Sequence, residues 1–233
     1  MATSSKWARW LYKHGASVLI AGGCLAASVS VAAPGAPPPI SNLERAVQAY
    51  EAGHILEAHR FFTKLSKQGS PLGDYNLAMM HLRKEAPNAQ PSEAQRLLKR
   101  AASRGLVRAS LTLGQIYDSG ALGKPDPVQA MQWFQRAAER GNADAQVAVA
   151  TGFYLGRGVE QNYRAAARWY RAAAGAGDVG AQYLLGSMYE HGTGVPQDLR
   201  LARHWYAAAA NNGDEAGPAK VKEMDTLLDP DEI

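Results

Sequence analysis

Apolar and small side chains recur along most of the chain at the spacing of amphipathic helices. Between Ala109 and Asp118 the apolar residues fall on one helical face, and this pattern stops at Gly120. The polar loop GALGKPD follows, and a second helical stripe then runs to Gly141. The pattern therefore predicts pairs of helices joined by short loops.

This pair of helical patterns returns with a period of 36 residues, the step from Gly105 to Gly141. The glycine position is held by Gly69, Gly105, Gly141, Gly177 and Gly213. An alanine position is held by Ala58, Ala94, Ala130, Ala166 and Ala202. Two adjacent bulky positions hold Phe61 and Phe62, Leu97 and Leu98, Trp133 and Phe134, Trp169 and Tyr170, and Trp205 and Tyr206. A chain with such regular columns is predicted to be a stacked repeat protein.

The ends of the second helix in each pair carry recognisable signals. Asp126, Asn162 and Asp198 share one column and are good N-cap residues. Pro127 follows the first of them, at a helical position where a missing N–H costs nothing. The recurring glycine can adopt the left-handed conformation that ends a helix. Ser41 or Asn42 is expected to cap the first helix of the array.

The many alanines are explained if neighbouring helices cross closely, because small side chains let the helix axes approach. Ala130, Ala137 and Ala138 and their equivalents are expected at these crossings. We expect Trp133, Trp169 and Trp205 to be mostly buried between the layers. An aromatic cage for a ligand is disfavoured, because Leu97 fills the same column.

These columns resemble the Sel-one-like repeat (SLR), a relative of the tetratricopeptide repeat. The motif appears here as Ala109, Leu113, Gly114, Tyr117 and Gly120, followed by Ala130, Trp133, Phe134, Ala137, Ala138 and Gly141. The resemblance implies an all-α, right-handed α-α solenoid of about five helix-turn-helix repeats with a C-terminal capping helix. It also implies a scaffold or adaptor that holds other proteins, in envelope assembly, secretion or signalling regulation, and no enzymatic activity.

The repeat register divides the chain into eight segments. They are a signal peptide (1–32), a proline-rich linker (33–40), a tetratricopeptide-like repeat (41–69), a degenerate SLR (70–105), three regular SLRs (106–141, 142–177 and 178–213), and a capping helix with an acidic tail (214–233). In the degenerate repeat, His81 replaces the tyrosine and Lys84 replaces the first glycine.

The N-terminus has the features of a secretory signal. Basic residues precede an apolar or small stretch from Ala16 to Val31, and small residues favour cleavage after Ala32. An uncleaved membrane anchor and a lipoprotein site at Cys24 are the alternatives. The segment APGAPPPI (33–40) is expected to be extended, because its four prolines cannot enter a helix. We therefore expect an exported, periplasmic protein that has no membrane segment after cleavage.

Removing the signal changes the charge and the cysteine chemistry. The chain has 25 basic and 21 acidic residues. The signal contributes Lys6, Arg9 and Lys13, so the mature net charge is 22 − 21 = +1. No basic patch indicates nucleic-acid binding. The only cysteine leaves with the signal, so the mature chain forms no disulfide.

Enzymatic chemistry is not predicted. His54, His59, His81, His191 and His204 lie outside the repeat columns, and none has a partner at metal-ligand spacing. No catalytic residues, metal ligands or cofactor are therefore expected. The alternative is an envelope hydrolase or penicillin-binding activity, as credited to cysteine-rich relatives, whose paired cysteines have no counterpart here. A deep pocket that places His191 or His204 beside a buried carboxylate would favour it.

The predicted working surface is the concave face lined by the first helices. Its candidate positions are expected to bind a protein or peptide segment. The sequence does not indicate the oligomeric state. The candidate positions are Tyr75, Met79, Leu82, Leu111, Gln115, Asp118, Val147, Thr151, Tyr154, Tyr183, Ser187 and Glu190. Alternatively, Tyr75, Leu111 and Val147 pack against the first helix of the next repeat. Tyr154 and Tyr183 are therefore the favoured anchors.

Overall fold

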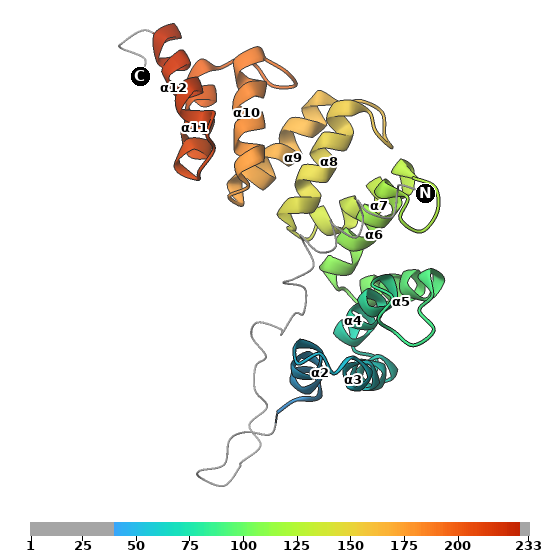
Figure 1. Cartoon of the computed structure of the whole chain (residues 1–233). Coiled ribbons are helices and arrows are strands. Elements are labelled where there is room, and N and C mark those ends of the chain that lie inside the picture. The colour runs from blue at the N-terminus through green and yellow to red at the C-terminus, as the bar shows by residue number, and fades with distance from the viewer. Residues whose placement is uncertain (1–39, 229–233) are drawn as a thin grey trace, which may run out of the picture. The chain divides into compact units, whose positions relative to one another are not determined.

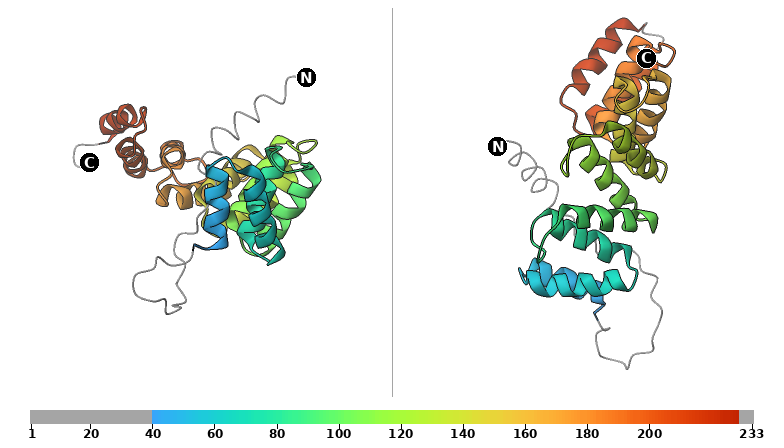
Figure 2. Two further views of the ribbon diagram at one scale, coloured as in Figure 1. Left: turned by 60° about the horizontal axis from the view of Figure 1, so that its bottom comes forward. Right: turned by 90° about the vertical axis from the view of Figure 1, so that its right-hand side faces the viewer.

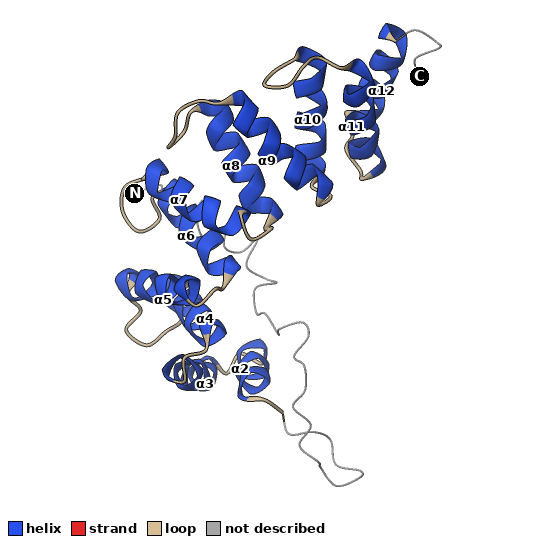
Figure 3. Cartoon of the chain, turned by 180° about the vertical axis from the view of Figure 1, so that it is seen from behind, coloured by secondary structure: helices blue, strands red, loops and turns tan. Residues whose placement is uncertain are grey.

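The computed structural model of the chain describes residues 40–228. The predicted signal peptide and all of the proline-rich linker except Ile40 lie outside the described residues. Within residues 40–228 every regular element is a helix and no strand occurs (Figure 3). The helices are α2 (Asn42–Glu51), α3 (Ile55–Lys67), α4 (Pro71–Leu82), α5 (Pro91–Ser103), α6 (Val107–Ser119), α7 (Pro127–Ala138), α8 (Ala143–Leu155), α9 (Tyr163–Gly175), α10 (Val179–His191), α11 (Leu199–Asn211) and α12 (Gly217–Leu227).

The chain divides into two compact units, and the division falls within α6, between Ala109 and Ser110. In unit 1, α2 packs on α3, α3 on α4, and α4 on α5 (Figure 2). In unit 2, each helix from α7 to α12 packs on the next one (Figure 1). Each unit is thus a run of helices that bury their apolar faces against their sequence neighbours.

The recurring glycine ends the second helix of each pair in the way the sequence predicts. Gly69, Gly105, Gly141, Gly177 and Gly213 all have positive φ, between 83° and 97°. At Gly141, the glycine N–H donates to Ala138 O at 2.9 Å, and the Asn142 N–H donates to Ala137 O at 3.2 Å. These two bonds make a Schellman motif, which the other four glycines repeat.

The predicted N-caps are confirmed. Asp126, Asn162 and Asp198 each accept a hydrogen bond from a backbone N–H of the first helical turn, at 2.9 Å. Ser41 caps α2 in a reciprocal capping box with Glu44. Sequence reasoning missed Asn142 and Asp178, which directly follow the recurring glycine and cap α8 and α10. At Gly141–Asn142 and Gly177–Asp178, the C-cap of one repeat and the N-cap of the next therefore adjoin in sequence.

The three tryptophans are mostly buried, as expected, but none of them is fully buried. Trp133, Trp169 and Trp205 keep part of their surface exposed, whereas the next residue in each helix is in the core. Phe134, Tyr170 and Tyr206 are 9%, 3% and 0% exposed. In α9, Tyr170 shares a helical face with Ala166 and Ala173, which are both fully buried. Trp169 lies about 100° around the helix from Tyr170, so it packs at the edge of the core.

The buried aromatic also explains a glycine in the first helix of the motif. A Cβ at Gly186 would lie 2.9 Å from the ring of Tyr206, and one at Gly114 would lie 2.4 Å from the ring of Phe134. The aromatic ring of the second helix therefore packs directly against the backbone of the first. The recurring alanine supplies the rest of this contact, because all five members of its column are at most 1% exposed.

The second glycine of each GRG or GTG loop lies against the preceding repeat. A Cβ at Gly158 would lie 2.1 Å from Pro127 O, and one at Gly194 would lie 2.3 Å from Tyr163 O. Pro127 and Tyr163 are the first residues of α7 and α9. These glycines are required because the loop backbone touches the start of an earlier helix.

The degenerate repeat in unit 1 keeps the geometry of the regular ones with different residues. Lys84 has φ 61°, close to the 68° of Gly120, Gly156 and Gly192 in the same column. His81 Nδ1 accepts the N–H of Gln90 at 3.2 Å. In the regular repeats the equivalent N–H donates to a backbone carbonyl, as Asp126 N does to Tyr117 O at 2.8 Å. The imidazole therefore replaces a carbonyl as the acceptor.

Candidate functional site

The positions predicted for the concave face differ in accessibility. Tyr75, Met79 and Leu111 are 2%, 7% and 9% exposed, so they are packing residues in this conformation. Tyr154 is 37% exposed. The remaining positions are partly buried: Leu82, Gln115, Asp118, Val147, Thr151, Tyr183, Ser187 and Glu190. Asp118 already forms an ion pair with Arg157, at 3.1 Å.

Unit 2 contains a cavity of about 380 Å³ between α8, α9 and α10. Its volume falls in the range of about 300–1,000 Å³ that is usual for ligand pockets. The lining residues are Tyr154, Tyr170, Leu184, Ser187, Met188, His191 and Thr193. The structure therefore brings together Tyr154 and Ser187 from the predicted set. Repeat-column reasoning did not find the other lining residues.

Tyr154 is positioned by a second tyrosine. Its ring meets that of Tyr163 edge-on, with the ring centroids 5.1 Å apart. Both rings are accessible, since Tyr163 is 40% exposed. Behind them, the Tyr170 hydroxyl bonds to Thr151 Oγ1 at 2.9 Å, and burial raises the pKa of Tyr170. An accessible tyrosine, Tyr154, held by its contact with Tyr163, thus lines the cavity together with a buried tyrosine that stays un-ionised.

Tyr183, the second predicted anchor, does not line this cavity. Its ring packs edge-on against Tyr206, with the centroids 5.0 Å apart. Burial, together with the hydrogen bond to Glu190, raises the pKa of Tyr206. Burial alone would raise the pKa of Glu190, but hydrogen bonds from Tyr206 and Lys220 lower it overall. Lys220 belongs to α12 and donates to Glu190 Oε1 at 2.9 Å. Glu190 therefore helps to hold α12 in place, and Tyr183 packs α10 against α11.

His191 is the one imidazole in the cavity lining, and its Nδ1 atom bonds within its own helix. Its Nδ1 lies 2.9 Å from the Ser187 carbonyl oxygen, which can only accept, so Nδ1 carries a proton. The Ser187 hydroxyl is farther away, at 3.5 Å, and cannot be deprotonated by a ring nitrogen that is itself a donor. The lining also contains no carboxylate. Within residues 40–228 no cluster of side chains suits a metal ion.

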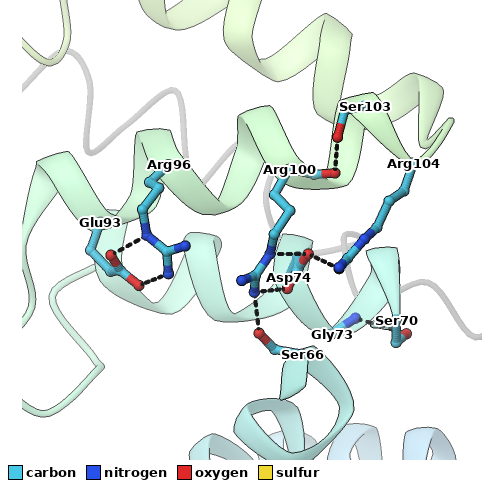
Figure 4. A network of polar contacts seen from close by, with 9 residues as sticks. All are labelled: Ser66, Ser70, Gly73, Asp74, Glu93, Arg96, Arg100, Ser103 and Arg104. Carbon is cyan, nitrogen blue, oxygen red and sulfur yellow. Dashed lines mark hydrogen bonds and ion pairs between the residues drawn. The ribbon is translucent and has the colours of Figure 1, made fainter. Parts of the chain in front are cut away.

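Unit 1 has a buried polar cluster of a different kind (Figure 4). Asp74 in α4 is fully buried and accepts from Arg100 Nε and from Arg104 Nη1, each at 2.8 Å. Arg100 also donates to Ser66 Oγ at 2.6 Å. The hydrogen bond to Asp74 raises the pKa of Arg100. Arg100 Nη2 also donates to Asp74 Oδ1, so both carboxylate oxygens are occupied and the cluster joins α3, α4 and α5.

Paired helices in a regular period, closed by glycine caps and packed through an aromatic ring on a glycine or alanine, define an α-α solenoid repeat protein. The Sel1 repeat matches residues 71–106, 108–142, 143–178 and 179–214. The chain therefore belongs to the Sel1 repeat family, whose members are generally protein–protein interaction scaffolds and typically lack enzymatic activity.

Solved structures agree with this assignment. The chain is 30% identical to a Sel1 repeat protein from Oxalobacter formigenes, with a TM-score of 0.66 over 79% of this chain and 75% of the other. It is 28% identical to a protective antigen of uropathogenic Escherichia coli strains that displays an SLR fold, with a TM-score of 0.65. That match covers 82% of this chain but only 43% of the antigen. No curated protein matches the chain.

Proposed function

We propose that the protein is a periplasmic adaptor that holds a segment of another protein in the cavity of unit 2. The observation that carries this proposal is the accessible Tyr154–Tyr163 pair at a cavity of ligand-binding size. Leu184 adds a 41% exposed apolar side chain at the same place. Tyrosine beside apolar surface is typical of the residues that dominate protein-binding energies. Nucleic acid is not among the proposed partners.

Photo-crosslinking tests the site directly. A photoreactive phenylalanine analogue replaces Tyr154 in one variant and Val128, which is 53% exposed and outside the cavity lining, in the other. We expect position 154 to trap a discrete partner that position 128 does not trap. Equal trapping at both positions would show that the cavity is not the binding site.

A second experiment measures the contribution of the cavity side chains. Tyr154→Ala with Leu184→Ala removes two accessible lining residues, and Val128→Ala with Leu201→Ala is the matched control. We expect the first pair to weaken binding of the crosslinked partner at least about tenfold. Both pairs should keep the wild-type circular dichroism spectrum. Unchanged binding by the cavity pair would refute the proposal.

Export is the second part of the proposal, and it rests on the signal-like sequence of residues 1–32. No helix in residues 40–228 has the length and apolar character needed to cross a bilayer. N-terminal sequencing of the protein from a periplasmic extract should start at Ala33. A chain that keeps Met1 in the membrane fraction, or one that begins at a lipidated Cys24, would replace this proposal with an anchored protein.

A further inference from the structure

The cavity of unit 2 lies between two equivalent places in the array that are each closed by an ion pair. Asp118, Tyr154 and Glu190 are equivalent positions near the ends of α6, α8 and α10. Asp118 pairs with Arg157 at 3.1 Å, and Glu190 pairs with Lys220 at 2.9 Å. In both cases the basic residue lies beyond the next recurring glycine, so the ion pair joins one repeat to the following segment. Tyr154 lies between these two acids in the order of the repeats, and it is uncharged and lines the cavity.

The positions that supply the base elsewhere are uncharged at the cavity as well. Leu184 is equivalent to Lys220, and Thr193 is equivalent to Arg157. Both Leu184 and Thr193 line the cavity. The side chains that would form an ion pair here are therefore a tyrosine, a leucine and a threonine. We call this place the open junction, and the places of the two ion pairs the closed junctions.

A buried tyrosine lies under the open junction and under the second closed junction. Tyr170 and Tyr206 are equivalent positions, and they are 3% and 0% exposed. At the closed junction, Lys220 Nζ lies 5.7 Å from the centroid of the Tyr206 ring, and the Tyr206 hydroxyl donates to Glu190. At the open junction, Tyr170 lines the cavity instead. The ion pair at one junction thus covers a ring whose equivalent faces the cavity at the other.

We infer that the open junction takes an uncharged aromatic side chain of the partner protein, and that the ion pairs close the equivalent junctions to it. This inference rests on the proposed function, because it identifies what fills the same cavity. The lining contains no carboxylate, lysine or arginine, so a charged side chain would lose its hydration without gaining an ionic partner. The rings of Tyr154 and Tyr170 and the thioether of Met188 favour an aromatic occupant through ring–ring and sulfur–ring contacts.

The size and the polar groups of the open junction agree with this occupant. A cavity of about 150 Å³ already holds a benzene ring. The volume of about 380 Å³ therefore accommodates an aromatic side chain together with the peptide groups next to it. The hydroxyl groups of Ser187 and Thr193 both donate and accept hydrogen bonds, so they suit the N–H and the C=O groups of the inserted segment.

Small blocked amino acids test the preference for an uncharged aromatic group. The N-acetyl amides of phenylalanine, leucine and lysine are each titrated into the full chain, and amide NMR shifts are followed around Ser187, Met188 and Thr193. We expect the phenylalanine probe to bind at least about threefold more tightly than the leucine probe, because only its ring gains aromatic contacts. The lysine probe should bind at least about tenfold more weakly than the phenylalanine probe. Equal binding of the three probes, or no binding of any, overturns the inference.

A double substitution tests whether an ion pair closes the junction. Tyr154→Glu with Leu184→Lys copies the Glu190–Lys220 pair into the open junction. Tyr154→Gln with Leu184→Met is the matched control, because it replaces the same side chains by uncharged ones of similar length. The charged variant should bind the phenylalanine probe at least about tenfold more weakly than the uncharged variant, while both keep the wild-type circular dichroism spectrum. Equal binding by the two variants would overturn the closing role of the ion pair.

Photo-crosslinking at residue 154 keeps this inference apart from the proposed function. If residue 154 traps a partner that residue 128 does not trap, but the phenylalanine probe does not bind, the inference is wrong and the proposed function stands. A probe that binds the wild-type chain and the uncharged variant, but not the charged variant, supports the inference.

Discussion

In unit 1, position 74 carries a fully buried carboxylate, whereas positions 146 and 182 of the same column carry amides in unit 2. Asp74 is bound by two arginines from the following helix and its C-terminal turn. Gln146 and Gln182 donate from Nε2 to Ala138 O and Ala174 O, at 3.3 and 3.1 Å. One position in the first helix thus joins adjacent helices through charge in one unit and through amides in the other.

The side chains that donate to this column also come from equivalent positions. Arg104 and Asn212 are equivalent positions. Arg104 donates to Asp74, and Asn212 Nδ2 donates to Gln182 Oε1 at 3.0 Å. Among Asp74, Gln146 and Gln182, only Gln146 lacks such a donor. Its Oε1 is buried without a hydrogen-bond partner, because Ala176 occupies the position from which Asn212 donates. In two of the repeats the same two columns are therefore joined by side-chain hydrogen bonds, although the groups that form these bonds differ.

Removing the carboxylate of unit 1 should have the largest effect. Asp74→Ala leaves Arg100 and Arg104 without a counter-ion in a part-buried site. We expect a loss of about 2–4 kcal/mol in unfolding free energy, below the full range for a broken buried pair because both arginines keep solvent contact. Urea denaturation followed by circular dichroism measures it. Gln182→Ala is the matched change in unit 2 and should cost about 1 kcal/mol. Equal losses would remove the distinction between the units.

Gly194→Ala tests a contact seen between repeats in unit 2. The new Cβ would meet backbone atoms of Tyr163 at 2.3 Å, and the residue has φ 72°. Because a backbone cannot move aside as a side chain does, we expect a loss of about 2–3 kcal/mol. Gly141→Ala is the control, since its Cβ would meet nothing within 4 Å and only the positive φ, 83°, opposes it. A control that is more damaging than Gly194→Ala would contradict the packing argument.

Adding a hydrogen-bond donor for Gln146 should stabilise unit 2. Ala176→Asn places an amide where Asn212 stands one repeat later, within reach of the unpaired Gln146 Oε1. We expect a gain of about 0.5–1 kcal/mol, the usual net value of a hydrogen bond. Thermal unfolding measures it, and Gln146→Leu with Ala176→Asn should abolish the gain. A stabilisation that persists without the glutamine would mean that the new amide acts elsewhere.

The smallest expected effect is a pH dependence of the stability of unit 1. Burial lowers the pKa of His81, and burial with repulsion from His81 lowers that of His59. The unfolded chain therefore binds more protons below pH about 6.5, so the stability of unit 1 falls as the pH drops through this value. Melting temperatures between pH 7.5 and 5.5 should fall less in His81→Gln, which keeps an acceptor for Gln90 N but cannot titrate. The same slope in both proteins would assign the effect to other groups.

The period of the sequence predicts the helix ends well, because each cap depends on one residue and its immediate neighbours. Asp126 and Gly141 fulfil their predicted roles for this reason. The burial of Trp169 and Tyr170 could not be assigned in the same way. Both are large and adjacent, and which one enters the core depends on the rotation of α9 against two other helices. The alanine stripe carries that information, since Ala166 and Ala173 share the face of Tyr170.

The cavity is harder to predict than the fold. Tyr154 and Ser187 were predicted because they lie close to the repeating positions of Leu113 and Tyr117 in the first helices. Thr193 belongs to a loop, and Tyr170 belongs to a second helix that was assigned wholly to the core. Their meeting depends on the tilt between α8 and α10, which no single helix encodes. The contact of Tyr183 with Tyr206 could not be predicted for the same reason, because it forms only across two helices.

The adjoining caps at Gly141–Asn142 and Gly177–Asp178 have an evolutionary consequence. Each junction is closed by bonds to the helix before it and to the helix after it, and both sets lie within a few residues. A gene segment that encodes one whole period can therefore be duplicated or lost at this point without leaving an unmatched end. The array can change length by recombination while each junction keeps its local structure, so its reach can evolve separately from its binding chemistry.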